Sequence, residues 1–381
     1  MVAPYGQRAA NIKHQIDKMS DSKKKLRLVL EDGTAFEGVS FGGEHSRAGE
    51  VVFNTAMSGY PESLTDPSYA GQILVFTYPL IGNYGVPHDD VDPATGLPKF
   101  FESEKIHVAG VVVSDYSHEY SHWNAQKSLA QWLKEQDIPA IEGVDTRALT
   151  QKIREKGAML GKLEFVDQPV DFTDPNKENL VAQVSPKEVT TYGNGKYKVV
   201  MVDTGAKFNI IRCLLKRDVT VIRVPWDYDF TQIDYDGLML SNGPGDPQQC
   251  QTTVRNIKKA IEIGKPIFGI CLGNQLLGIA AGCKTYKLPY GHRAHNHPVI
   301  KCGTNQCYIT SQNHGFAIDT TTLGPDWEPS FVNINDGTNE GIRHKTLPIF
   351  STQFHPEASS GPTDTEKFFD EFVENIAKSK K

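Results

Sequence analysis

The second half of the chain alternates short apolar runs with amphipathic stretches. The apolar runs are short enough for buried strands, and the stretches between them carry apolar positions at helical spacing. This rhythm predicts a parallel sheet with helices on both faces, which is a doubly wound α/β domain. The active site of such a domain lies beyond the carboxyl ends of its strands. Strands are predicted at 198–203, 219–224, 237–241, 266–270 and 348–353, and helices at 207–217, 250–263, 274–281 and 364–377.

The first half mixes strand and helix patterns without this regular alternation. Leu26–Leu30 reads as a strand, and the Asp32-Gly33 turn separates it from a second strand at 35–38. A helix is predicted over 124–136, where Ala125, Leu129, Trp132 and Leu133 form one apolar stripe. Asp145 or Thr146 would cap the next helix. The first half is therefore a mixed α/β domain, with further strands predicted at 51–54, 73–77 and 108–114.

These patterns divide the chain into four segments. Residues 1–25 are polar and rich in lysine, which predicts a flexible tail. Residues 26–165 form the first domain and residues 198–378 the second. Residues 166–197 are rich in Asp, Pro, Asn and Gly, and we expect a linker there with one short helical piece.

Composition narrows the possible functions. The net charge of −6 comes without a basic stripe, so nucleic-acid binding is not expected. No apolar run is long enough to cross a bilayer, so no membrane contact is expected. The 6 cysteines have no framework-like spacing and no secretory signal precedes them, which favours a reducing compartment. A mitochondrial presequence is rich in Arg and poor in acidic residues, whereas residues 1–25 contain only Arg8 and include Asp17 and Asp21. This favours the cytoplasm, although a mitochondrial location is not excluded.

The pentapeptide Gly269-Ile270-Cys271-Leu272-Gly273 carries the clearest chemical signal. It joins a predicted strand to a predicted helix, which is the cysteine version of a nucleophile elbow. A cysteine at a helix N-terminus is favoured as a thiolate, and the next N–H, on Leu272, can hold an oxyanion. Far downstream, His355 and Glu357 can supply a base and the carboxylate that orients it. Together these residues predict acyl transfer.

Four motifs in order make residues 198–377 resemble a class I (triad-type) glutamine amidotransferase domain. The first half resembles the small, glutaminase portion of carbamoyl-phosphate synthetase, so the resemblance spans about 26–376. The amidotransferase motifs are Ser241 to Pro247, Gly269 to Gln275, Gln312 to Phe316 and Gln353 to Ala358; the first-half motifs are Phe53 to Glu62, Leu64 to Tyr69, Tyr78 to Asn83 and Gly143 to Arg147.

The resemblance implies a glutaminase that serves a synthetase. Cys271 would attack the glutamine side-chain amide, with His355 as base and Glu357 as its orienting carboxylate. The oxyanion would be held by the N–H groups of Leu272 and Gly243. The ammonia would pass through a tunnel to a synthetase subunit or domain that makes carbamoyl phosphate from bicarbonate and ATP. This chain itself would hold no cofactor or metal, since ATP and Mg²⁺ belong to the partner. The family motif assigns glutamine binding to Ser68, Gly243, Gly245, Leu272, Gln275, Asn313, Gly315 and Phe316.

Three other features modify this interpretation. Asn274 stands where many family members carry His, and we expect it to tune the pocket or its coupling. A group of His and Cys residues in 292–307 lacks a familiar zinc spacing and overlaps a family loop around Arg293, so ordinary loop and strand residues are expected there. His118, His122 and Trp123 are expected on a solvated loop.

Two alternatives stay open. A glutaminase fold can persist as a non-catalytic scaffold that regulates the synthetase, since fold does not determine function. Related urea-cycle synthetases replace the nucleophile, so the presence of Cys271 favours an active enzyme. An amidotransferase for a different synthetase is disfavoured by residues 53–69 and 143–147. The sequence is compatible with a free subunit or part of a longer polypeptide, and with a product used for pyrimidines, arginine or urea.

Overall fold

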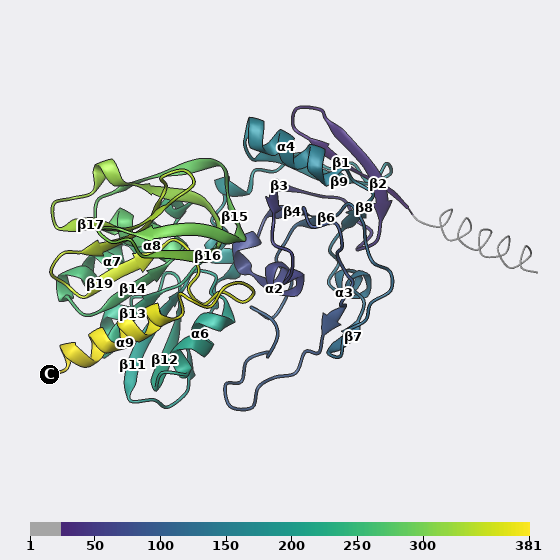
Figure 1. The fold of residues 1–381 in the computed structure, drawn as a ribbon. Helices are drawn as coiled ribbons and strands as arrows, with labels where there is room; N and C mark the ends of the chain where they lie inside the picture. Colours follow the sequence, from purple (N-terminus) through teal and green to yellow (C-terminus); the bar gives the residue numbers. More distant parts are fainter. Residues whose placement is uncertain (1–23) are drawn as a thin grey trace, which may run out of the picture.

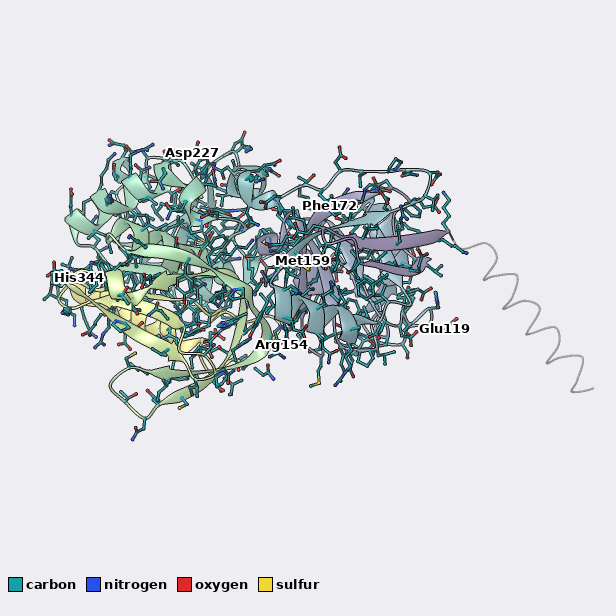
Figure 2. The ribbon with its side chains drawn as sticks, turned by 90° about the horizontal axis from the view of Figure 1, so that it is seen from above. Glu119, Arg154, Met159, Phe172, Asp227 and His344 are labelled. Atoms are coloured by element: carbon teal, nitrogen blue, oxygen red, sulfur yellow. The ribbon has the colours of Figure 1, made fainter. Side chains whose placement is uncertain are left out.

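The computed structural model describes residues 24–381, which form two lobes in contact with each other (Figure 1). The tail predicted over 1–25 lies almost wholly outside the described residues. Its last residue, Lys25, already belongs to the first strand, β1 (Lys25–Leu30). Figure 2 shows Glu119 and His344 at opposite ends of the molecule, with Met159 and Arg154 near the junction of the lobes.

The N-terminal lobe is built on a closed barrel of seven strands. Alternate side chains of β1, those of Leu26, Leu28 and Leu30, are buried in its interior, as the period of two requires. β3, β4, β6 and β8 run parallel, and the other pairs are antiparallel. The barrel order is β1, β2 (Ala35–Ser40), β8 (Ala140–Glu142), β6 (Gly110–Val112), β4 (Gln72–Phe76), β3 (Arg47–Asn54) and β9 (Met159–Glu164).

The helices of this lobe begin at side-chain caps. α4 (Thr146–Lys156) is capped by Asp145, whose carboxylate accepts the Ala148 N–H at 2.9 Å, so the predicted cap is confirmed. The prediction of a helix over 124–136 was wrong at its start. The helix α3 spans Leu129–Glu135, and the Ser128 side chain caps its first turn. The preceding residues form the short strand β7 (Ala125–Lys127), which pairs with β5 (Val86–Pro87). The helical period of the stripe could not reveal this cap.

The segment between the lobes is more structured than a linker with one helical piece. It contains the predicted short helix, α5 (Leu180–Val184), and in addition a 3-10 turn at Pro175–Lys177 and the strand β10 (Thr190–Tyr192). β10 pairs antiparallel with β12 (Val219–Pro225) and forms one edge of the C-terminal sheet.

The C-terminal lobe has the predicted parallel strands at the centre of a ten-stranded sheet. The order within this centre is β12, β11 (Tyr197–Asp203), β13 (Gly237–Leu240), β14 (Ile267–Ile270) and β19 (Ile349–Thr352). Helices cover both faces, which confirms the doubly wound α/β class: α6 (Phe208–Leu215) and α9 (Lys367–Ser379) pack on one face, and α7 (Gln251–Ile263) and α8 (Leu272–Ala280) on the other.

Four antiparallel strands extend this sheet beyond β19 and were not predicted as strands. The region around Arg293, expected as a loop, lies in the long strand β15. Polar residues interrupt its alternation, and two register shifts break its pairing with β16, so no clean period of two is visible in the sequence. The four strands are β15 (Lys284–Lys301), β16 (Cys307–Asp319), β17 (Trp327–Asn333) and β18 (Asn339–His344). Within residues 24–381, no helix combines the length and the apolar character needed to cross a membrane.

Candidate active site

Cys271 lies at the sharp turn between β14 and α8. Its φ of +54° is in the left-handed region, which is costly for a residue with a side chain and common at functional sites. The flanking glycines allow the turn, because a Cβ on Gly273 would come within 2.3 Å of the Leu240 carbonyl oxygen. The predicted strand–turn–helix arrangement is therefore present. The thiol is 2% exposed and is directed at the Asn313 carbonyl oxygen, 3.6 Å away.

His355 follows β19, the strand beside β14, which brings its imidazole to the same end of the sheet. Its Nδ1 lies 2.7 Å from Glu357 Oε1, so Nδ1 carries a hydrogen and donates a hydrogen bond to the carboxylate. The other ring nitrogen, Nε2, is buried and has no hydrogen-bond partner among the described residues. Burial lowers the pKa of His355, but Glu357 and Cys271 raise it more, so the net pKa lies above its usual value. The site thus favours an imidazolium beside the nucleophile.

Lys207 completes this charge arrangement and was missed in the sequence. Its Nζ lies 3.3 Å from Glu357 Oε1 and also donates to the Ala358 carbonyl oxygen. Burial raises the pKa of Glu357, whereas His355 and Lys207 lower it by more, so the carboxyl is held ionised. Lys207 follows the carboxyl end of β11, where active-site residues of such sheets gather, and this position is the signal that could have identified it.

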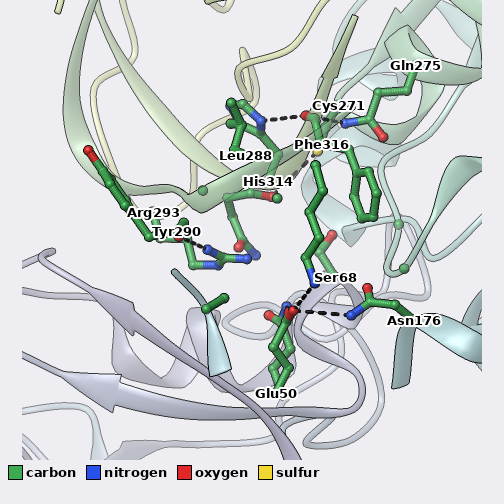
Figure 3. A pocket seen from close by; sticks show the side chains of 18 residues that line it. Glu50, Ser68, Asn176, Cys271, Gln275, Leu288, Tyr290, Arg293, His314 and Phe316 are labelled. Atoms are coloured by element: carbon green, nitrogen blue, oxygen red, sulfur yellow. Dashed lines mark hydrogen bonds and ion pairs between the residues drawn. The ribbon is translucent and has the colours of Figure 1, made fainter. Parts of the chain in front are cut away.

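A cavity opens beside Cys271 and is lined by residues of both lobes (Figure 3). The structure brings most of the residues expected to bind glutamine together in its wall. Leu272 is not in the wall, but its side chain packs against Gly243, where an added Cβ would lie 2.8 Å from it. Their contacts with glutamine and with an oxyanion stay predictions. The expected residues that line the cavity are Ser68, Gly243, Gly245, Gln275, Asn313, Gly315 and Phe316.

Hydrogen bonds across the lobe interface hold this wall in place. Asn242 Nδ2 donates to Ser68 Oγ at 2.9 Å, and Asn313 Nδ2 donates to Asp66 Oδ2 at 3.0 Å. Gln275 Nε2 donates to the Phe316 carbonyl oxygen at 2.9 Å. Ser68 comes from the first lobe, so the pocket borders the interface as expected. Asp66 was missed, although it lies two residues before Ser68 in the same motif.

The side of the cavity formed with the barrel contains charged residues that the sequence analysis did not assign. Glu50 of β3 is 4% exposed and pairs with Lys287 of β15 at 2.5 Å. Gln72 and Asn176 also donate to the Glu50 carboxylate, at 2.9 and 3.1 Å. Arg293 of β15 lines the same cavity. These residues lie far apart in sequence, and only the docking of the two lobes brings them together.

His355 also borders a second, smaller chamber, which shares Asn313 with the first. Lys207 and His295 line this second chamber as well. Burial lowers the pKa of His295 to about 4, so its imidazole is neutral. His355 therefore faces a polar space that is separate from the cavity beside Cys271.

Asn274 is fully buried and contacts other side chains instead of lining the cavity. Its Nδ2 donates to Gln353 Oε1 at 2.9 Å, and its Oδ1 accepts from Ser351 Oγ at 2.7 Å. Gln275 Nε2 also donates to Gln353 Oε1, at 3.2 Å, so the Gln353 side chain links Asn274 to Gln275 in the cavity wall. This geometry supports the expected tuning role.

Of the histidines discounted as a metal site, His292 and His297 stack with ring centroids 4.7 Å apart, whereas His295 lines the second chamber. His292 forms ion pairs with Asp336 at 2.7 Å and with Glu340 at 3.4 Å. The ligand atoms of His292, Glu340 and His314 lie within 4.8 Å of one another, but Cys302 and Cys307 are not in this group. The other polar–aromatic group lies outside the cavity: His118 contacts Glu142 at 3.3 Å, and Trp123 is 86% exposed.

Comparisons with known proteins match both lobes. The family model "Carbamoyl-phosphate synthase small chain, CPSase domain" matches residues 28–163, and "Glutamine amidotransferase class-I" matches residues 200–375. The arginine-specific small chain of carbamoyl phosphate synthase from Saccharomyces cerevisiae is 52% identical over 372 residues, covering 94% of this chain and 90% of that protein.

Longer proteins also contain a matching region. "Carbamoyl-phosphate synthase [ammonia], mitochondrial" from Aquarana catesbeiana is 53% identical over 366 residues, which are 95% of this chain and 24% of that protein. Multifunctional protein CAD from Squalus acanthias is 55% identical over 353 residues, which are 91% of this chain and 16% of that protein. The chain thus spans about a quarter or less of the length of these two relatives.

Proposed function

We propose that this chain, which belongs to the family of carbamoyl-phosphate synthase small chains, hydrolyses glutamine and delivers the ammonia to a synthetase. One observation carries the proposal: Cys271, at a strained turn beside a cavity, shares the site with a buried His355 that is oriented by Glu357 at 2.7 Å. A thiol, a base and an orienting carboxylate are the groups that acyl transfer needs.

The reaction proceeds in two steps. The thiol proton passes to His355 Nε2, which gives the thiolate and the imidazolium that the site favours, and Cys271 Sγ attacks the side-chain amide carbon of glutamine. As the C–N bond breaks, His355 returns the proton to the nitrogen, which leaves as ammonia. Water then attacks the thioester with His355 as base, releasing glutamate and regenerating the thiol. The N–H groups of Leu272 and Gly243 hold the oxyanion in both steps.

The partner in this proposal is the large subunit or domain of a carbamoyl-phosphate synthetase. It binds ATP and Mg²⁺ and uses bicarbonate, while this chain holds neither cofactor. The small-chain family supports such a partner, and relatives such as protein CAD carry a matching region within a much longer chain. All six cysteines are free thiols, which supports a reducing compartment, and we place the chain in the cytosol, with the mitochondrial matrix as the alternative.

The test compares the wild-type protein with Cys271→Ser, each with and without the synthetase partner. We expect glutamate release that depends on Cys271 and increases with the partner. Cys271→Ser should abolish glutamine-dependent synthesis of carbamoyl phosphate but leave ammonia-dependent synthesis intact. If wild-type protein releases no glutamate beside a partner that works on free ammonia, the chain is a scaffold. That second function is favoured only by relatives whose names contain "[ammonia]".

A further inference from the structure

Three antiparallel strands of the C-terminal lobe bring two histidines and a carboxylate together. His292 on β15 lies directly opposite His314 on β16, Glu340 lies on β18, and all three side chains are buried. Their ligand atoms lie within 4.8 Å of one another. Glu340 is 0% exposed, yet its Oε2 has no hydrogen-bond partner among residues 24–381. A buried carboxylate oxygen without a partner is costly, so this atom needs a donor or a cation that the described residues do not supply.

The orientation of Gln312, which lies between the two histidines, is fixed by a chain of hydrogen bonds. Thr310 Oγ1 donates to the His297 carbonyl oxygen at 2.9 Å, so it can only accept from Gln312 Nε2, at 3.1 Å. Gln312 Oε1 is therefore the atom that faces the histidines. It lies 3.0 Å from His292 Nδ1 and 3.1 Å from His314 Nε2.

Each histidine has its other nitrogen bound to a hydrogen-bond acceptor. His292 Nε2 donates to Asp336 Oδ2 at 2.7 Å, and His314 Nδ1 donates to the Phe316 carbonyl oxygen at 2.9 Å. Burial lowers the pKa of His314 well below its usual value, so its imidazole is neutral and Nε2 carries no hydrogen. Nε2 and Gln312 Oε1 thus face each other as two acceptors, which repel unless a cation lies between them. Histidines that bind metals have this arrangement, with the second nitrogen held by a carboxylate or a carbonyl oxygen.

We propose that this cluster binds a Zn²⁺ ion. The ligands are His292 Nδ1, His314 Nε2, an oxygen of Glu340, and Gln312 Oε1. Tetrahedral ligands at about 2.0–2.1 Å from zinc stand about 3.3 Å from one another. Gln312 Oε1 lies 3.0 and 3.1 Å from the two nitrogens, and Glu340 Oε1 lies 3.4 Å from His292 Nδ1, which matches this spacing. Imidazole suits zinc, whereas Mg²⁺ and Ca²⁺ prefer oxygen ligands.

The charges of the cluster also fit a divalent cation. Glu340 and Asp336 bring two negative charges, which Zn²⁺ balances, whereas a protonated His292 would leave one of them in excess. The ion joins β15, β16 and β18 and fixes one wall of the cavity, because His314 also lines that cavity. This departs from the expectation of a chain without metal. Of the four ligands only His292 belongs to the group in 292–307, so spacing within that group does not reveal the site.

The experiment measures zinc binding by the whole chain and needs no glutaminase activity. The protein is stripped with a chelator, and zinc chloride is then added in calorimetry and in thermal unfolding. We expect one tightly bound zinc ion per chain and a higher melting temperature with zinc. Asp336→Asn changes only the carboxylate behind His292 and should weaken zinc binding about 10- to 100-fold. Glu340→Gln should weaken it further, because a ligand itself is lost.

The matched control is His297→Asn. His297 stacks on His292 with ring centroids 4.7 Å apart but is not a ligand, so this variant should bind zinc as the wild type does. The inference is overturned if the stripped protein takes up no zinc, or if the affinity is unchanged in Asp336→Asn. Zinc uptake that survives Glu340→Gln in a folded protein would also overturn it and would indicate adventitious binding at exposed side chains such as Cys307. A loss of zinc in His297→Asn as large as that in Glu340→Gln would refute the assignment of the ligands.

Discussion

Replacing Glu357 with Gln should damage both catalysis and folding, and the two effects should be separable. Glu357 accepts a hydrogen bond from His355 and lies 3.3 Å from Lys207 Nζ. The Glu357 side chain is 0% exposed and the Lys207 side chain 6%. At this distance and an effective dielectric constant of about 20, the attraction between the two charges is about 5 kcal/mol. Desolvation offsets much of that energy, so the pair itself contributes little net stability.

Removing only one partner is different, because it leaves a buried charge without compensation. Glu357→Gln strands Lys207, and breaking a buried pair in this way costs about 3–5 kcal/mol of unfolding free energy. The double variant Glu357→Gln/Lys207→Met removes the stranded cation, so it should regain at least about 2 kcal/mol. Glutaminase activity should fall roughly 10³- to 10⁴-fold in both variants, because His355 loses the carboxylate that orients it.

The assay combines denaturant unfolding of the wild-type, both single and the double variants with glutamate release from each. The folded baselines of the unfolding curves must match among the variants, so that activity is compared between natively folded proteins. A double variant as unstable as Glu357→Gln would show that Lys207 is not the stranded charge. Retention of more than a tenth of the activity in Glu357→Gln would refute the orienting role of the carboxylate.

Three further predictions concern single positions. Burial raises the pKa of Glu62 to about 7, so at neutral pH the folded protein keeps a proton that the unfolded chain has released. Between pH 4.5 and 8, the unfolding free energy of the wild type should therefore fall by about 2 kcal/mol relative to that of Glu62→Gln. Denaturant unfolding measures this difference. Gly243→Ala would place a Cβ 2.1 Å from the Thr204 carbonyl oxygen, and we expect a loss of glutamate release of about 100-fold or more, whereas the control Gly324→Ala, with its nearest atom at 4.0 Å, should keep full activity. Asn274→Ala removes two buried hydrogen bonds, those with Gln353 and Ser351, and should lower the unfolding free energy by about 1–3 kcal/mol.

The parallel centre of the C-terminal sheet and the proposed catalytic residues could be predicted from the sequence. The strands around β14 are continuous apolar runs, because both faces of a parallel strand are covered by helices. Cys271 is recognisable since its turn depends on local glycines, and the motif places His355 and Glu357 at a fixed spacing of two. Local backbone chemistry of this kind is visible in a short window of sequence.

Contacts that depend on long-range pairing were not accessible in the same way. β15 and β16 carry polar side chains toward the cavity and are interrupted by register shifts, so their alternation is obscured. Lys207 and Arg293 each lie beside recognisable motifs, but nothing local shows that the first reaches Glu357 or that the second lines the cavity beside Cys271. Such facts arise only when distant strands pack together.

The barrel lobe contributes to the candidate active site, because its side chains form hydrogen bonds with residues around the cavity beside Cys271. Asp66 accepts from Asn313 and from Asn242, two residues of the other lobe, while Ser68 accepts from Asn242. Glu50 of the barrel fixes Lys287 in the wall. An isolated C-terminal lobe would lose these partners and leave several buried polar groups unsatisfied at its pocket. The proposed catalytic residues would remain on one lobe, but the cavity beside Cys271 is formed by both lobes.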